Sequence, residues 1–175
     1  TTGGIAAAEI LAGDINPSGK LAMTFPRSTG QVPIYYNRRG AARRHQGFYK
    51  DIPSTPLYPF GHGLSYTTFA YGKPEVSDSV FTSTDKVTVT VPVTNTGSRA
   101  GAETVMWFTA DPAASVTRPL KELKHFEKRD LQPGETAVFT FTIDPAMHLS
   151  FPDNDGNPRL EPGDFKVMVG PYTLN

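Results

Sequence analysis

The sequence contains no cysteine, and it has no excess of charge of either sign. Without cysteine the chain can form neither a disulfide framework nor a nucleophilic thiolate. Its 17 Lys and Arg residues balance its 17 Asp and Glu residues. Nucleic-acid-binding proteins carry basic residues that neutralise phosphates, so this balance argues against a nucleic-acid partner.

Long hydrophobic runs are also missing. No run approaches the ~20 apolar residues that a membrane-spanning helix requires, and no secretory signal peptide is visible. The first residues, TTGGIAAAEILAGD, lack an initiator methionine, and we expect them to lie inside a longer polypeptide. Glycine and proline are frequent, at 16 residues each, whereas long helical patterns are nearly absent. This composition predicts many short strands joined by turns.

The N-terminal part of the sequence predicts one helix, one turn and one strand. Alanine favours a helix over residues 4–12, which Gly13 ends. Residues 21–25 alternate between apolar and other side chains, as in a strand. These elements bury too little apolar surface to fold alone. They must therefore pack on protein that lies outside this sequence, or on the domain that follows.

Residues 27–58 show little periodicity, which indicates a long irregular connection. Connections longer than ~12–15 residues are usually functional or disordered. Disordered segments are poor in aromatic residues. This connection contains Tyr35, Tyr36, Phe48, Tyr49 and Tyr58. We therefore expect it to be ordered by lying across another surface.

Residues 74–175 carry the alternating pattern of half-buried strands. The run DKVTVTVPVTNTG places four valines on one face. Pro92 lies in this run and lacks an amide donor, so we expect it at a sheet edge or a bulge. Three more strands are predicted at residues 103–111, 134–144 and 163–170. The residues predicted to face inward are Val87, Val89, Val91, Val93, Ala137, Phe139, Phe141, Ile143, Phe165, Val167 and Val169.

Residues 118–131, RPLKELKHFEKRDL, are expected to contribute Leu120, Leu123, Phe126 and Leu131 to the same core. Trp107 is the main aromatic residue not assigned an inward position. Roughly seven short strands in about 100 residues are typical of an immunoglobulin-like or fibronectin type III-like β-sandwich. The predicted fold class is therefore mainly β, with a short α/β remnant and a long irregular linker before the sandwich.

Two motifs suggest catalysis or phosphate binding only superficially. In GDINPSGKL the glycines are six residues apart and Leu21 replaces the hydroxyl that a phosphate-binding loop requires, so a turn is expected. In GLSYT, Thr67 replaces the second glycine of a nucleophile elbow, and no helix follows. His62 lies between two glycines, and we expect it to make structural hydrogen bonds.

Metal and carboxylate sites are not expected either. Residues 153–157, DNDGN, lack the spacing of a calcium loop and predict a hairpin turn. The four histidines, at positions 45, 62, 125 and 148, are too scattered for a zinc site. Glu122, Glu127 and Asp130 alternate with basic residues, as on the solvent face of an edge strand. We therefore assign no catalytic residue, no metal ligand and no cofactor to this chain.

Four motifs, in this order, resemble the C-terminal part of glycoside hydrolase family 3 enzymes, with bacterial periplasmic β-glucosidases as the most similar type. They are GDINPSGKLAMTFPRSTGQVPIYYN, PLYPFGHGLSYTTF, RPLKELKHFEKRDLQPGETAVFTFTID and LEPGDFKVMVG. The resemblance implies three regions: the tail of an α/β sandwich domain (residues 1–30), an interdomain crossing segment (31–70) and a fibronectin type III-like domain (71–175). The partner it implies is the remainder of such an enzyme, a barrel and the rest of the α/β domain, in the periplasm or outside the cell.

The resemblance also implies a retaining mechanism, with an aspartate nucleophile from the barrel and a glutamate acid/base from the middle domain. The nucleophile usually lies in a Ser-Asp-Trp-type motif, which this sequence lacks. Both carboxylates are expected upstream, so these residues alone should not hydrolyse glycosides. Loops of this family can line the outer sugar site. Arg44, Phe48 and Tyr49 are the substrate-proximal candidates here, through hydroxyl bonding and ring stacking.

Residues 56–69, which we name the strap, combine prolines that fix the backbone with glycines that let it bend. Its rings bury large areas at low entropic cost. We expect the strap to hold the terminal sandwich against the catalytic parts. The alternative is a stand-alone β-sandwich module that binds polysaccharide or protein. Such a sugar-binding module should expose a row of aromatic residues on one sheet face.

Overall fold

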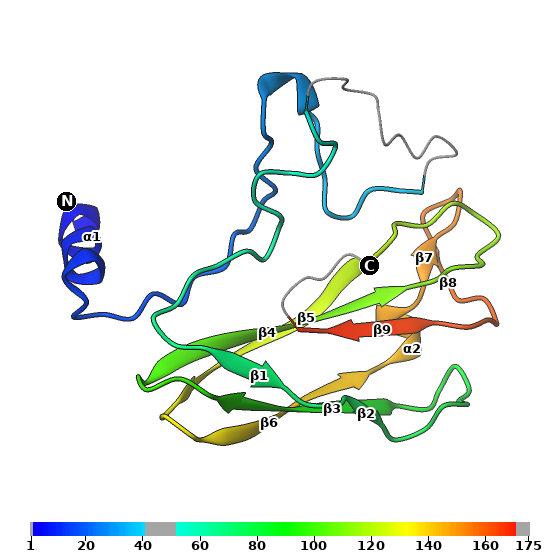
Figure 1. Ribbon diagram of the computed structural model, residues 1–175. Helices are drawn as coiled ribbons and strands as arrows, with labels where there is room; N and C mark the ends of the chain where they lie inside the picture. Colours follow the sequence, from blue (N-terminus) through cyan, green and yellow to red (C-terminus); the bar gives the residue numbers. More distant parts are fainter. Residues whose placement is uncertain (1, 41–51, 171–175) are drawn as a thin grey trace.

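The computed structural model describes residues 2–40 and 52–170. A β-sandwich forms the larger body, an irregular lobe lies above it, and a helix stands apart at the N-terminus (Figure 1). The elements are α1 (Thr2–Ala12), a 3-10 turn (Thr29–Gln31), β1 (Phe69–Tyr71), β2 (Glu75–Val76), β3 (Val87–Asn95), β4 (Gly101–Ala110), β5 (Glu122–Leu131), β6 (Thr136–Ile143), α2 (Pro145–His148), β7 (Phe151–Pro152), β8 (Pro158–Arg159) and β9 (Lys166–Val169).

Two antiparallel sheets form the sandwich. In one sheet β3 pairs with β6 on one side and with both β1 and β2 on the other. In the second sheet β4 lies between β5 and β9. A two-stranded hairpin of β7 and β8 lies at one end (Figure 1). The predicted fold class, a mainly β fibronectin type III-like sandwich, is confirmed.

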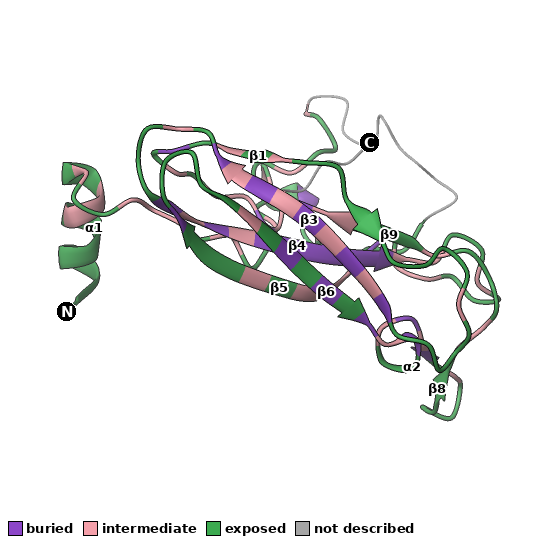
Figure 2. Ribbon diagram, turned by 90° about the horizontal axis from the view of Figure 1, so that it is seen from below, coloured by how far each residue is buried: buried purple, intermediate pink, exposed green. Residues whose placement is uncertain are grey.

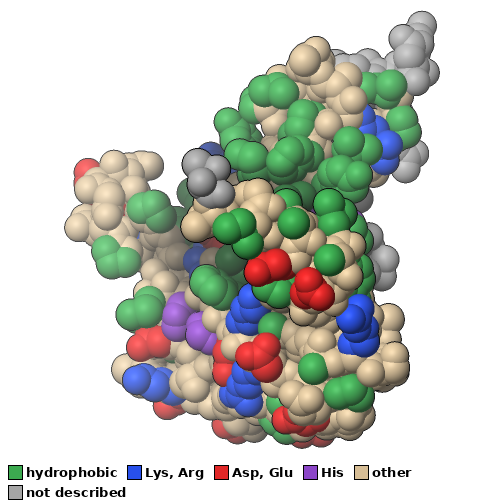
Figure 3. Space-filling view, turned by 90° about the vertical axis from the view of Figure 1, so that its left-hand side faces the viewer, with side chains coloured by type: hydrophobic (Ala, Val, Ile, Leu, Met, Phe, Trp, Pro, Cys, Tyr) green, Lys and Arg blue, Asp and Glu red, His purple; other side chains and the backbone are tan. Residues whose placement is uncertain are grey.

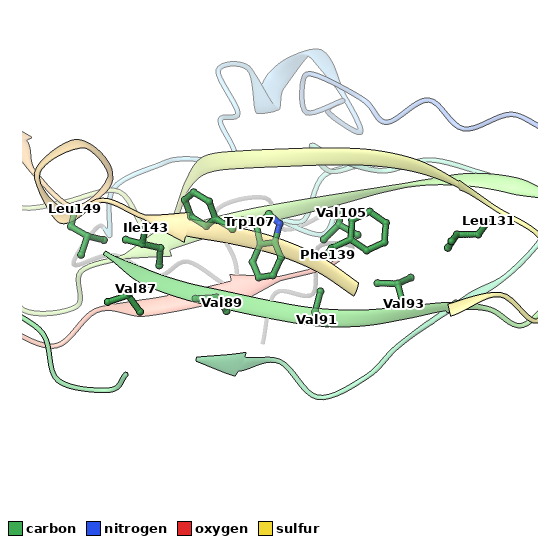
Figure 4. Packing of buried hydrophobic residues seen from close by; sticks show 11 residues of the cluster. Val87, Val89, Val91, Val93, Val105, Trp107, Leu131, Phe139, Ile143 and Leu149 are labelled. Carbon is green, nitrogen blue, oxygen red and sulfur yellow. The ribbon is translucent and has the colours of Figure 1, made fainter. Parts of the chain in front are cut away.

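Alternation along β3 and β6 builds the core between the sheets. Every second residue of β3, from Val87 to Asn95, is buried, and Figure 2 shows this as alternating colour along the strand. In-register pairing places Val89 beside Phe141 and Val91 beside Phe139. β1 and β2 meet β3 on either side of Pro92, which neither strand pairs. Figure 4 shows how the valines of β3 face the large side chains of β4 and β6.

Trp107 of β4 is fully buried in this core, so its exclusion from the inward set is wrong. Its ring lies 6.0 Å from Phe141, and its indole N–H has no hydrogen-bond partner among residues 2–40 and 52–170. The strand 103–111 that we expected is therefore present, but the parity of its buried residues could not be read from the sequence. β4 has buried residues on both faces in its second half, which removes the alternation.

Three predicted core residues lie outside the core. Phe126 is 62% exposed, Leu120 is 40% exposed and Val167 is 37% exposed. Leu131 is buried as predicted. The pairing of β4 with β5 is continuous from Leu131 to Phe126, which are five positions apart, so the two side chains lie on opposite faces and Phe126 points outward.

The predicted strand at residues 21–25 is also wrong. Only Phe25 makes an isolated bridge, to Tyr58, and Met23 is 63% exposed. Within the described residues no neighbouring strand extends this bridge, and a strand needs a ladder partner. The predicted helix is confirmed as α1, although none of its residues is buried.

The predicted hairpin turn at residues 153–157 is confirmed. Asp153 Oδ1 accepts hydrogen bonds from the backbone N–H groups of Asp155 and Asn157, at 2.9 Å each. Gly156 adopts the left-handed conformation that such a turn requires. No group of three or more potential metal-ligating side chains occurs among the described residues. Over the same residues, no helix is long and apolar enough to cross a membrane.

Candidate interdomain interface

The outer face of the β5-β4-β9 sheet is covered by the crossing segment. Tyr36 and Phe60 stack with ring centroids 4.1 Å apart. Both rings meet the edge of Phe108, which is only 2% exposed, at 6.2 and 6.4 Å. Met106 is buried beside them, and a Cβ on Gly61 would collide with its side chain. At Tyr36 the described part of the irregular connection (residues 27–58) thus lies across another surface, that of the sandwich, as we expected.

The strap also forms backbone hydrogen bonds with residues 21–25, which follow α1 in the chain. Leu21 N–H donates to the His62 carbonyl and Gly61 N–H donates to the Leu21 carbonyl, each at 2.8 Å. Further along, Phe25 N–H donates to the Tyr58 carbonyl at 2.8 Å. The ring of His62 contacts that of Tyr58 at 4.9 Å. These backbone bonds join residues 21–25 to residues 58–62, so His62 has the structural role that we expected.

A buried carboxylate anchors this region to the sandwich. Glu103 of β4 is 4% exposed, and its carboxylate lies 3.1 Å from Lys20 Nζ. Tyr71 Oη donates to the same carboxylate at 2.7 Å. Burial, and then the Glu103 charge, raise the pKa of Tyr71 well above its usual range, so its hydroxyl keeps its proton. Pairing and hydrogen bonding together compensate the buried charge of Glu103.

The N-terminal region also exposes many large apolar side chains to solvent. Hydrophobic side chains gather over the upper lobe on the side that α1 faces (Figure 3). The large apolar residues of this region that are 41–85% exposed are Ile5, Leu11, Ile15, Met23, Phe25, Val32, Tyr35, Leu57, Tyr58, Leu64 and Tyr66. An apolar surface of this kind marks a site of protein association. We call these residues the apolar face.

The predicted substrate-proximal residues Arg44, Phe48 and Tyr49 lie outside the described residues. The chain that leads to them is attached to the sandwich, because Leu120 N–H donates to the Arg38 carbonyl at 2.9 Å. Nearby, Lys121 is 6% exposed, and its Nζ lies 4.3 Å from the centre of the Phe108 ring. Burial lowers the pKa of Lys121 to about 8. Sequence reasoning did not single out this lysine, and its position within KELK gave no signal.

The carboxylates that we weighed as sugar-hydrolysis candidates lie on an edge strand, as expected. Glu122 pairs with Arg118 at 3.0 Å, and Glu127 pairs with Arg129. Both belong to β5, which pairs with β4 on one side. Ser65, the serine of the rejected nucleophile motif, donates from Oγ to Asn16 Oδ1 at 3.0 Å. The partner of the Ser65 hydroxyl is therefore an amide oxygen.

Two family models match the chain in different regions. The glycosyl hydrolase family 3 C-terminal domain matches residues 1–66, and a fibronectin type III-like domain matches residues 103–172. A periplasmic beta-glucosidase of Salmonella typhimurium is 44% identical over 178 residues, an alignment that covers 97% of this chain and 23% of the relative. The chain belongs to glycoside hydrolase family 3.

Other family 3 proteins agree in sequence and in fold. Thermostable beta-glucosidase B of Acetivibrio thermocellus is 39% identical, over 95% of this chain and 23% of its own length. A β-glucosidase structure from Erythrobacter marinus superposes with a TM-score of 0.91 at 45% identity, over 99% of this chain and 22% of that one. The structure of a Listeria innocua β-glucosidase in complex with glucose superposes with a TM-score of 0.85 at 38% identity. The match covers 96% of this chain and 24% of that one. This chain thus spans about a quarter of the length of these family 3 relatives.

The contact between the strap and the chain after α1 can be tested at Gly63. A Cβ added there would collide with the Gly19 carbonyl oxygen and lie 2.8 Å from Lys20 Cδ. Backbone cannot yield as a flexible side chain can, so Gly63→Ala is expected to cost about 1–3 kcal/mol. Urea unfolding, followed by the fluorescence of Trp107, the only tryptophan, measures this.

Gly19→Ala is the matched control, because nothing lies within 4 Å of a Cβ at that position. It should leave the unfolding midpoint unchanged or slightly higher. Equal midpoints for Gly63→Ala and Gly19→Ala would contradict the close approach of the two segments.

Proposed function

We propose that this chain is the non-catalytic C-terminal portion of a retaining β-glycosidase of the β-glucosidase type, which hydrolyses terminal β-linked sugars. Its own role is to stabilise that enzyme. Two features of the N-terminal region support the proposal: its contact with the sandwich and its exposed apolar residues. The region is pinned to the sandwich through Glu103 and Lys20. The same region exposes the apolar face, which includes Ile5 and Leu11 of α1, and no residue of α1 is buried.

The partner of the apolar face is the remainder of the enzyme, a barrel and the rest of an α/β sandwich domain. Residues 1–30 would be the tail of that α/β domain, residues 31–70 the crossing segment and residues 71–175 the fibronectin type III-like domain. An isolated helix of about 11 residues is marginal in water, which supports a packing partner for α1. Each large apolar residue buried there would contribute on the order of 2 kcal/mol.

A contribution to the outer sugar subsite is the second part of the proposal. Phe48 and Tyr49 would stack on a sugar ring, and Arg44 would donate hydrogen bonds to its hydroxyls. Attachment of the preceding chain supports this. The Arg38 carbonyl accepts from Leu120, and Arg39 bridges to Pro119. In this proposal the sandwich fixes the position of residues 38–39 and so the point from which the chain leads to Arg44, Phe48 and Tyr49.

An extracytoplasmic location, in the periplasm or outside the cell, completes the proposal. The Salmonella typhimurium relative is named a periplasmic beta-glucosidase, which supports this location.

Hydrolysis of nitrophenyl β-glucoside tests the proposal. The purified chain of 175 residues is expected to release no nitrophenol, whereas a longer polypeptide that contains it and the upstream domains should release it. Mass spectrometry of the intact sample must first exclude a companion polypeptide. Turnover by a verified companion-free chain would contradict the assignment of both catalytic carboxylates to the upstream domains.

The alternative of a stand-alone sugar-binding module receives little support from the sandwich. Such modules expose a row of aromatic rings on one sheet face. Among the described residues from 71 to 170, Phe126 is the only exposed aromatic residue. A monomeric 19.0 kDa chain that binds polysaccharide would nevertheless favour the module.

A further inference from the structure

The sandwich holds the carbonyl end of α1. Tyr66 Oη donates to the Ile10 carbonyl at 2.7 Å, and Arg99 Nη2 donates to the Gly13 carbonyl at 2.9 Å. The Arg99 guanidinium also lies 5.6 Å from the centre of the Tyr66 ring. Carbonyls at the end of a helix have no partner within the helix. The Ile10 carbonyl also accepts from the Gly13 N–H at 3.0 Å, and Gly13 directly follows α1. A strap residue and a residue of the β3–β4 connection thus add two further donors at this end of the helix.

The charge of Arg99 suits this position. The C-terminal end of a helix carries a partial negative charge, which a nearby cation stabilises. The last turn of α1 contains no basic residue. The helix therefore lacks its own compensating cation, and the sandwich supplies one from a position 86 residues along the chain.

The turn after α1 is fixed at a second point. Asn16 Nδ2 donates to the Ala100 carbonyl at 2.9 Å, beside Arg99. Asn16 Oδ1 accepts from Ser65 Oγ at 3.0 Å and from the Tyr66 N–H at 2.8 Å. One side chain thus joins the turn to both the strap and the β3–β4 connection. A change in the orientation of this turn relative to the strap would break these hydrogen bonds.

Glu103 fixes the third point, through Lys20. The Lys20 side chain is 17% exposed and that of Glu103 is 5% exposed, so solvent screens this pair far less than a surface pair. Gly63 lies against the same stem, since a Cβ there would approach Lys20 Cδ to 2.8 Å. Contacts with Glu103 and Gly63 therefore hold Lys20 in place at the point where the chain leads from the sandwich to α1.

We propose that Arg99 and Glu103 are positioning residues, which fix the direction in which α1 leaves the sandwich. None of the residues of α1 is buried, so in this chain its direction is set at its carbonyl end (Figure 1). The role of this fixed direction, docking to the α/β domain, rests on the proposed function. The sandwich presents α1 in one orientation to the α/β domain, and so lowers the entropic cost of docking the two domains.

Distances between spin labels on α1 and on the sandwich test the direction of the helix. The sequence has no cysteine, so Ala8→Cys and Thr140→Cys introduce two specific label sites at exposed positions. The parent double-labelled chain is expected to give one narrow distance distribution. Arg99→Gln and Glu103→Gln should each broaden that distribution and shift its maximum. A broad distribution in the parent chain would overturn the proposal.

Two surface variants are matched controls. Glu127→Gln removes the same charge as Glu103→Gln from the exposed pair with Arg129, and Arg159→Gln removes the same charge as Arg99→Gln from the pair with Glu161. Both should leave the distribution unchanged. Equal broadening in test and control variants would overturn the proposal.

Folding of each variant is checked by Trp107 fluorescence before the distances are read. If Glu103→Gln does not fold, Arg99→Gln decides the result alone, because the side chain of Arg99 lies at the surface. Failure of the proposed function is distinguishable from failure here. A narrow parent distribution that broadens in Arg99→Gln, in a chain whose longer form has no glycosidase activity, would uphold the positioning role and refute the glycosidase.

Discussion

Replacing Arg118 with Met is expected to destabilise the sandwich by about 3–5 kcal/mol. The Arg118 side chain is 7% exposed and pairs with Asp111 at 3.5 Å and with Glu122 at 3.0 Å. It also donates to the Leu149 carbonyl at 2.9 Å, and its guanidinium lies over the ring of Phe151. Arg118 thus joins the β4–β5 connection to the end of α2 and to β7.

The cost arises mainly from the partner that is left behind. The Asp111 side chain is only 7% exposed, so its charge would remain buried without a cation. Asp111→Asn in the Arg118→Met background should recover part of the loss, because it removes that charge. Urea unfolding followed by Trp107 fluorescence measures each variant.

Arg159→Met is the matched control, because its side chain is 58% exposed and pairs with Glu161 at the surface. Its expected cost is below about 1 kcal/mol. If Arg118→Met unfolds at the same urea concentration as Arg159→Met, the buried ion pairs of Arg118 make no net contribution to the free energy of unfolding.

Replacing Asn95 with Ala is expected to cost on the order of 3 kcal/mol. Asn95 is fully buried at the end of β3. Its Oδ1 accepts from Thr67 Oγ1 at 2.6 Å and from the Gly97 N–H at 3.1 Å. Its Nδ2 donates to the Arg99 carbonyl at 2.8 Å and to the Leu131 carbonyl at 2.9 Å. Truncation removes the partner of each group and leaves a cavity.

Asn95→Asp separates the two halves of this network. It keeps the two acceptor contacts and loses both donor contacts, while adding a charge that is costly to bury. We expect it to be at least as destabilising as Asn95→Ala in urea unfolding. Asn157→Ala is the control, since Asn157 is exposed and bonds to Asp153 through its backbone. Equal midpoints for Asn95→Ala and Asn157→Ala would show that the network contributes nothing.

The sequence by itself determined the strands that alternate cleanly. β3 and β6 are buried on one face only, so valines and phenylalanines at every second position show which residues face the core. The alanine-rich helix and the hairpin turn at Asp153 follow from local chemistry in the same way. Motif order also pointed to family 3.

Only the tertiary structure determined which faces of β4 and β5 are buried. The crossing segment covers Met106 and Phe108, so β4 is buried on both faces and its alternation disappears. Phe126, by contrast, is apolar and exposed, because it lies on the face of β5 opposite to Leu131 and the described residues leave that position open to solvent. Alternation defines two faces of a strand, but it cannot tell which face another segment will cover.

The interface also depended on the tertiary structure. Lys20 and Glu103 are separated by 83 positions, and Gly13 and Arg99 by 86. Such pairs carry no local signal, since each charged residue alone resembles a solvated surface residue. Lys20 and Glu103 meet because β9 pairs with β4 only at residues 107–110, which leaves the first half of β4 open to the strap and to Lys20. Packing of the whole chain, not local sequence, brings these charges together.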